Sequence, residues 1–271
     1  MRPALAASCL AFCVAAVVGS AAAGGPDAAP GTSGLAPPPG APGAGDADTS
    51  AAADGSADPD LSLPSVIGSF STTLLGSNPA RTHNIRLAAN ALDGTLLEPG
   101  VELSFNERVG PRTPERGYLV APVILREERQ LQLGGGICQV ASTVFDAALV
   151  AGLTPVERYR HSSPVDYIAP GEDATIAWGY KDLKLRNDSE QTVRLRVGVV
   201  GSTLLARIEA EAPTELSFEL LTEERDVPAS TDSNLPGREI ELYRIHLQDG
   251  QEIEREFVHR DLYPSARIKD R

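Results

Sequence analysis

The chain has 271 residues, of which 42% are hydrophobic, and a formal net charge of −13 at pH 7. This length is sufficient for one large domain with a small addition. The acidic balance argues against nucleic acid or an anionic membrane as a partner. Composition divides the chain into three parts, which are residues 1–23, residues 24–60 and a folded part from residue 61 onward.

Residues 1–23 have the features of a secretory signal peptide. Arg2 supplies a positive start, Leu10 to Val18 form an apolar run, and Ala21-Ala22-Ala23 fits a small-residue cleavage site. The apolar run is too short to span a bilayer comfortably, although an uncleaved anchor is the alternative. We therefore expect an extracytoplasmic protein, in the periplasm, in the cell envelope or secreted, with no stable transmembrane anchor after cleavage.

Residues 24–60 consist mainly of Ala, Gly, Pro, Ser and Asp, which predicts a disordered linker. Cleavage after residue 23 would also remove Cys9 and Cys13. The mature chain would then contain Cys138 as its single cysteine and no internal disulfide. Such a cysteine is either a small buried hydrophobic residue or a reactive thiol.

The folded part predicts an α+β fold. Hydrophobic periodicity predicts helices over 82–92 and 138–151. Strands are predicted over 69–75, 101–105, 118–125, 155–161, 173–178, 183–185, 192–199, 204–208, 218–220, 240–245 and 252–258. We expect one mixed domain over 61–212, with a central helix packed on an antiparallel-rich sheet. A small, separate β-rich segment over 213–271 should follow it.

The stretch Gly134-Gly135-Gly136-Ile137-Cys138 is the main candidate for chemistry. Glycines allow a tight turn, and the positive end of a helix favours a thiolate. His161 and Asp173 follow in the order nucleophile, base and orienting group. Cys138, His161 and Asp173 therefore predict acyl transfer, in which a thiolate attacks an amide or ester.

The helix start also offers groups for an oxyanion or a substrate, and the candidates are Gln132, Gly136, Gln139 and Arg112. No metal or cofactor is expected, because the spacing of Cys and His matches no usual zinc template and no phosphate-loop Gly-Lys-Ser/Thr follows the glycines. Structural alternatives stay open for all three triad residues. Cys138 would fill the core, His161 would bond to backbone, and Asp173 would cap a turn after Pro170-Gly171.

Several stretches of the sequence resemble the VanW family, named for an accessory protein of B-type vancomycin resistance clusters. They are Asn84-Ile85, Ala88-Ala89, Pro99-Gly100, Ser104-Phe105-Asn106, Gly110-Pro111-Arg112-Thr113, Gly117-Tyr118, Gly134 through Thr143, Arg158, His161-Ser162, Pro164-Val165-Asp166-Tyr167, Gly171 and Asp173-Ala174-Thr175. The resemblance covers about residues 65–210. Residues 237–264 look like the small β tail, related to G5-type modules, that often follows this domain.

The resemblance implies a bacterial protein that is exported or attached to the membrane and works at the cell wall. The expected partner is thus a cell-wall or peptidoglycan component, and the sequence sets no oligomeric state. Two classes of function stay open. The first is a Cys-dependent amidase, peptidase or transpeptidase acting on peptidoglycan or another wall component. The second is a non-catalytic wall-binding or scaffolding module. Trp178 could serve a glycan-binding groove, but its strand pattern favours a place in the core.

Overall fold

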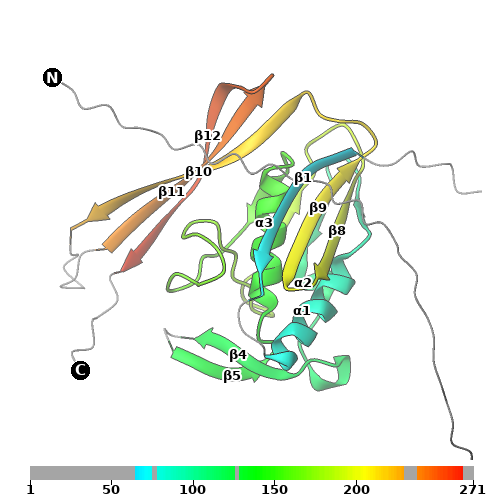
Figure 1. Ribbon diagram of the computed structural model, residues 1–271, viewed down its shortest axis with the longest axis vertical. Coiled ribbons are helices and arrows are strands. Elements are labelled where there is room, and N and C mark those ends of the chain that lie inside the picture. Colours follow the sequence, from blue (N-terminus) through cyan, green and yellow to red (C-terminus); the bar gives the residue numbers. More distant parts are fainter. Residues whose placement is uncertain (1–64, 75–77, 126–127, 229–236, 265–271) are drawn as a thin grey trace, which may run out of the picture. The chain divides into compact units, whose positions relative to one another are not determined.

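A computed structural model describes residues 65–74, 78–125, 128–228 and 237–264 (Figure 1). The predicted signal peptide (1–23) and linker (24–60) lie outside these residues. Within the described ranges, no helix combines the length and apolar character needed to cross a membrane.

Strands outnumber helices in the described part. The strands are β1 (Ser65–Thr73), β2 (Thr95–Leu97), β3 (Glu102–Ser104), β4 (Val120–Leu125), β5 (Glu128–Leu133), β6 (Thr154–Glu157), β7 (Lys184–Arg186), β8 (Val193–Val200), β9 (Thr203–Ala210), β10 (Leu216–Val227), β11 (Gly237–Gln248) and β12 (Gln251–Pro264). The helices are α1 (Pro79–Leu92), α2 (Phe105–Val109), the 3-10 turn η1 (Pro114–Arg116) and α3 (Ile137–Leu149). The described strands pair into antiparallel sheets with the orders β1-β9-β8-β2, β10-β11-β12, β3-β7-β6 and β4-β5. For the domain over 61–212 the sequence predicted one sheet, whereas the described strands there form three, and the sheet of β10, β11 and β12 follows them.

Helix α3 lies against β1 and β9 (Figure 1). Almost all of its side chains are buried, including the polar Gln139, Ser142, Thr143 and Asp146, so the helix lies in the interior of the fold. Gly68 of β1 lets the helix approach closely, since a Cβ there would lie 2.7 Å from the carbonyl oxygen of Ala147. The hydroxyls of Thr72 and Thr143 meet at 2.8 Å and join β1 to α3.

Around the expected site, one predicted strand is shorter than expected and another is absent. The strand predicted over 155–161 ends at Glu157, and the one predicted over 173–178 forms no strand beyond an isolated bridge between Ala177 and Lys181. Side-chain hydrogen bonds hold this segment, and backbone pairing between strands does not. Arg158 Nε, for example, donates to the carbonyl of Asp173 at 2.6 Å. His161 and Asp173 therefore lie on a long loop between β6 and β7, rather than on strands.

The hairpins follow their turn signals. β8 and β9 pair in register around Gly201-Ser202, as predicted. Asp249 and Gly250 both have positive φ, 52° and 76°, which is the two-residue turn that suits a tight hairpin between β11 and β12.

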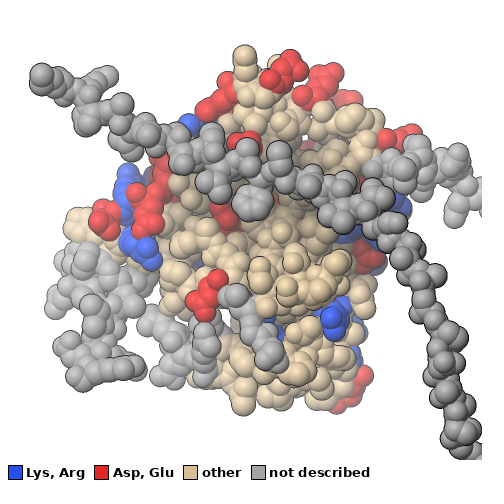
Figure 2. Space-filling model, viewed as in Figure 1, with Lys and Arg blue, Asp and Glu red and all other residues tan. Residues whose placement is uncertain are grey.

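The sheet of β10, β11 and β12 contacts the rest of the folded part, whereas the sequence indicated a separate appendage. Leu242 of β11 is fully buried in the main hydrophobic cluster. Arg244 of β11 donates to the carbonyl oxygen of Leu153 at 2.8 Å, just past the end of α3. On the described part of the face in Figure 2, acidic and basic side chains lie interspersed around larger uncharged areas.

Candidate active site

Cys138 lies in the first turn of α3 and is half-buried. The three glycines before it are needed for different reasons. Gly134 and Gly136 have φ of 77° and 102°, which side-chain-bearing residues rarely adopt. Gly135 has no such φ, but a Cβ there would lie 2.6 Å from the carbonyl oxygens of Ala121 and Pro122 in β4. The glycine turn therefore fixes the start of the helix against β4.

The Cys138 thiol donates to the carbonyl oxygen of Ile176 at 3.7 Å, and the His161 ring lies within hydrogen-bonding range of the same sulfur. Burial opposes ionisation of the thiol, but the hydrogen bond and the charge of His161 outweigh it and hold the pKa of Cys138 below its usual value. Burial likewise opposes charge on the ring, yet hydrogen bonds to Asp173 and Cys138 raise the pKa of His161 to about 9. Both shifts therefore favour a thiolate beside an imidazolium over a neutral thiol beside a neutral imidazole.

Asp173 holds the other side of the imidazole. Its Oδ2 accepts from the backbone N–H of His161 at 2.6 Å and lies 2.5 Å from His161 Nδ1. Because Nδ1 faces the carboxylate, Nε2 is the ring nitrogen left for the thiol. Burial would raise the pKa of Asp173, but the bonds from His161 and the charge of Arg158 lower it below its usual value. The carboxylate thus stays ionised and orients the base.

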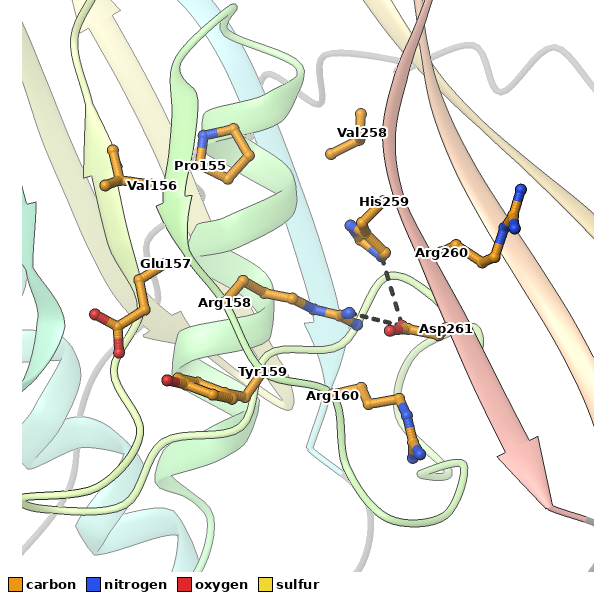
Figure 3. A pocket seen from close by; sticks show the side chains of 10 residues that line it. All are labelled: Pro155, Val156, Glu157, Arg158, Tyr159, Arg160, Val258, His259, Arg260 and Asp261. Carbon is orange, nitrogen blue, oxygen red and sulfur yellow. Dashed lines mark hydrogen bonds and ion pairs between the residues drawn. The ribbon is translucent and has the colours of Figure 1, made fainter.

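The second oxygen of Asp173 is held by residues far away in the sequence. Oδ1 accepts from Arg158 Nη2 at 3.1 Å and from the Tyr263 hydroxyl at 2.9 Å. Arg158 Nη1 also donates to Asp261 Oδ2 at 2.6 Å, as Figure 3 shows, and His259 approaches the same oxygen. Asp261, His259 and Tyr263 all belong to β12. The C-terminal sheet therefore supports the orienting carboxylate.

The residues predicted to bind an oxyanion or a substrate differ in how close they lie to the triad. Gln132 is exposed on β5 and, among the described residues, has no hydrogen bond to the triad. Gly136 is the N-cap of α3. Gln139 is buried, and its amide donates to Thr72 Oγ1 and to the Thr73 carbonyl, each at 2.9 Å. The side chain of Gln139 therefore anchors α3 to β1 and is not free for a substrate.

The start of α3 still offers an oxyanion donor. A helix leaves the N–H groups of its first turn without partners inside the helix. The amides of Ile137 and Gln139 bond to the carbonyls of Gly134 and Gly136, at 3.3 and 3.1 Å. The N–H of Cys138 is the remaining amide at this point, and it lies beside the nucleophile where an oxyanion would form.

Three polar side chains near the triad were not assigned a role from the sequence. Arg81 and Tyr167 lie within electrostatic range of Cys138, and the Tyr167 ring packs edge-on at 6.5 Å from His161. Tyr263 reaches Asp173 across 90 residues of sequence. Only Tyr167 had a signal, since it lies in a stretch that resembles the family. Within the described ranges, no cluster of three or more His, Cys, Asp or Glu side chains has the geometry for a metal ion.

Comparison with known proteins gives a family for the middle of the chain. Residues 80–209 match the family model described as "VanW like protein". Two relatives align with about half of the chain. YoaR of Bacillus subtilis (strain 168), described as uncharacterized, is 42% identical over 139 residues, covering 51% of this chain and 46% of the relative. The vancomycin B-type resistance protein VanW of Enterococcus faecalis (strain ATCC 700802 / V583) is 28% identical over 145 residues, covering 52% and 53%.

The chain therefore spans about half the length of the curated relatives it matches. No solved structure matches it. The matched residues include all three members of the triad, whereas Tyr263 and Asp261 lie beyond the family match.

Proposed function

Residues 80–209 belong to the VanW-like family, and we propose that this domain is a cysteine-dependent acyl-transfer enzyme. The observation that carries the proposal is the His161–Asp173 contact of 2.5 Å beside the Cys138 thiol, whose pKa the His161 ring lowers. A thiol, a base and an orienting carboxylate in this order are the parts that nucleophilic catalysis requires.

The residues would act as follows. The Cys138 thiolate attacks the carbonyl carbon of an amide or ester, and the Cys138 N–H stabilises the resulting oxyanion. The His161 imidazolium gives its proton to the departing amine or alcohol, which leaves a thioester on Cys138. Neutral His161 then takes a proton from water or from an acceptor amine, and attack on the thioester releases the acid or a new amide and restores the thiol–imidazole pair. Asp173 keeps the ring oriented throughout.

We propose the bacterial cell wall as the place of action and a peptidoglycan peptide or another wall amide as the substrate. One relative is named for B-type vancomycin resistance, and residues 1–23 have the pattern of an export signal. Fractionation of cells that express the chain tests the location, and N-terminal sequencing tests the processing. A mature protein that begins at Gly24 is the expected result, and an unprocessed cytoplasmic protein would contradict the proposed export.

The chemical proposal is tested by alkylating the thiol. Iodoacetamide should label Cys138 well below pH 8.5, the usual pKa of a free thiol being about 8.5. In His161→Ala the labelling profile should move up toward that value, because the imidazolium is lost. Mass spectrometry of the peptide that carries Cys138 separates this label from any on Cys9 or Cys13. His83→Ala is the matched control, since His83 bonds to the carbonyl of Gly117 on the surface.

A thiol that resists labelling, or that titrates near 8.5 in both wild type and His161→Ala, would show that the triad is not a catalytic device. The wall-binding or scaffolding module would then be the better account. That account is tested by incubating a Cys138→Ala variant with purified sacculi and measuring how much protein is retained.

A further inference from the structure

Two arginine side chains flank the glycine turn that carries the nucleophile. A Cβ at Gly134 would lie 2.9 Å from Arg112 Cγ, and a Cβ at Gly136 would lie 2.8 Å from Arg81 Cγ. The absence of side chains at these two positions therefore makes room for the two arginines. Both guanidinium groups lie within electrostatic range of the Cys138 thiol.

Neither arginine has an acidic partner among the described residues. Arg81 Nη2 donates to Gln139 Oε1, and Arg112 Nη1 donates to Asn106 Oδ1, each at 2.7 Å. Both acceptors are neutral amides. The carboxylate of Asp182 acts on Arg112 only through its charge. Its oxygens accept hydrogen bonds from Ser104 Oγ at 2.5 Å and from the Asn106 N–H at 2.8 Å.

Arg112 also keeps one donor unused. Its Nη2 atom is buried and has no hydrogen-bond partner in the part of the chain that the structure describes. A buried, charged donor without an acceptor is costly, so such a group usually has a ligand. The flat guanidinium fork fits a carboxylate better than it fits any neutral group.

A surface hollow lies next to two residues that contact Arg112. Asn106 and Trp178, which both contact the Arg112 guanidinium, line a depression of about 370 Å³ together with Tyr180 and Lys181. The acidic Glu107, Glu157 and Asp182 also line it, so the hollow suits the remainder of a ligand rather than its carboxylate. Trp178 is 49% exposed, so the prediction that it belongs to the core is wrong. A ligand bound to Arg112 would have room in this hollow for the rest of its chain.

We propose that the acyl donor carries a carboxylate and that Arg112, assisted by Arg81, binds this group beside the thiol. This inference rests on the proposed function and names its substrate class. A peptide with a free carboxyl group near the amide to be cleaved has this chemistry. The bound carboxylate would align the neighbouring carbonyl of the substrate with Cys138. It would also neutralise the positive charge of the two guanidinium groups.

Two alkylating agents of nearly equal shape test the inference. Iodoacetate carries a carboxylate and iodoacetamide a neutral amide, and in both cases the thiolate displaces iodide. Their rate ratio at one pH cancels the fraction of thiolate. In the full chain, the ratio of iodoacetate to iodoacetamide labelling at Cys138 should be at least tenfold above that of free N-acetylcysteine.

Substitution of the arginine should remove this preference. Arg112→Gln should bring the ratio down toward that of N-acetylcysteine, and Arg112→Lys should retain part of the preference, because the charge stays and the fork is lost. Arg108→Gln makes the same change in net charge at an exposed site, where Arg108 donates to the Ala91 carbonyl, and should leave the ratio unchanged.

Protection of the wild-type protein supplies a second measurement that needs no variant. N-acetylglycine should slow iodoacetamide labelling, and the neutral N-acetylglycinamide should not. A ratio like that of N-acetylcysteine together with equal effects of the two ligands would overturn the carboxylate site. In that case a thiol of low pKa that depends on His161 would leave the proposed function intact, whereas an ordinary thiol pKa would count against the function itself.

Discussion

The two ends of the Cys138–His161–Asp173 chain are held by different parts of the molecule. At the thiol end, a glycine turn directly before α3 fixes Cys138, so the geometry comes from neighbouring residues. At the carboxylate end, Asp173 lies on a loop and is held by Arg158 and by Tyr263 of β12. One half of the site is therefore local in sequence and the other half depends on the C-terminal sheet.

This difference has a consequence for what each region does. A change in the glycine turn moves the nucleophile itself. A change in β12 alters the support behind Asp173 while leaving the thiol and its helix in place. The two regions should thus be separable by substitution, with stability and thiol reactivity as the two measurements.

Substitution at the glycine turn should have the largest effect. In Gly135→Ala, the new Cβ would lie 2.6 Å from two backbone carbonyl oxygens of β4, which cannot turn away as a flexible side chain could. We expect a loss of about 3 kcal/mol in the free energy of unfolding, because overpacking of a well-packed site costs about this much. Urea denaturation measures the loss. Labelling by iodoacetamide should also change, since the start of α3 must shift.

Gly198→Ala is the matched control for this substitution. Gly198 lies in β8, has no positive φ, and a Cβ there would meet nothing within 4 Å. It should be neutral or stabilising by about 0.5–1 kcal/mol, because alanine loses less chain entropy than glycine. Equal stability of the two variants would refute the close approach at Gly135.

Substitution at the β12 support should have a smaller effect. Tyr263→Phe removes the hydroxyl that donates to Asp173 Oδ1 at 2.9 Å and accepts from the Gly171 N–H at 3.3 Å. We expect a loss of about 2 kcal/mol in unfolding free energy, as for other hydrogen bonds to charged groups. The thiol should keep its low pKa, because Asp173 Oδ2, which faces His161, is unaffected.

Tyr243→Phe provides the comparison within the same sheet. The Tyr243 hydroxyl also bonds to a carboxylate, Glu241 Oε2 at 2.6 Å, but on the solvent side of the sheet. Its loss should change stability by no more than about 0.5 kcal/mol. If Tyr263→Phe were equally mild, the C-terminal sheet would not be supporting the triad.

The same division explains what the sequence could predict. The glycine turn and α3 were predictable because glycine chemistry and helical periodicity are local signals, and the helix differs from its expected bounds by only one or two residues at each end. The alternating pattern from Pro155 to His161 is typical of a strand, but the chain leaves the sheet after Glu157. Side-chain hydrogen bonds then fix the position of the loop.

The order Cys138, His161, Asp173 was visible in the sequence, but the support behind it was not. Tyr263 and Asp261 contact Asp173 and Arg158 across 90 and 103 residues, and no spacing rule connects such positions. Arg81 had no signal either, because its nearness to the thiol arises from the packing of α1 against α3. The predicted export signal, linker and wall partner stay predictions.

The smallest expected effect is a pH dependence at the junction of the two regions. The pKa of His161 is raised to about 9, so its contribution to stability is full below about 6.5, the unfolded value, and is lost as pH rises through about 9. The pKa of Cys138 is lowered, so its contribution is full above about 8.5 and is lost as pH falls through its folded value.

Between about pH 6.5 and 8.5 these two trends should cancel, because the folded thiolate–imidazolium pair and the unfolded thiol–imidazole pair hold the same number of protons. The difference in unfolding free energy between wild type and the double variant Cys138→Ala/His161→Ala should therefore be flat across this range. It should shrink with a slope of one proton, about 1.4 kcal/mol per pH unit, on either side. A difference that changes steadily between about pH 6.5 and 8.5 would mean that only one member of the folded pair is charged, and a neutral folded pair would show no loss on either side of this range. Denaturant unfolding of both proteins from pH 5 to 10 decides between these states. It therefore shows whether the proton of the folded Cys138–His161 pair lies on the imidazole, which the long-range contacts of Asp173 support, or on the thiol at the local glycine turn.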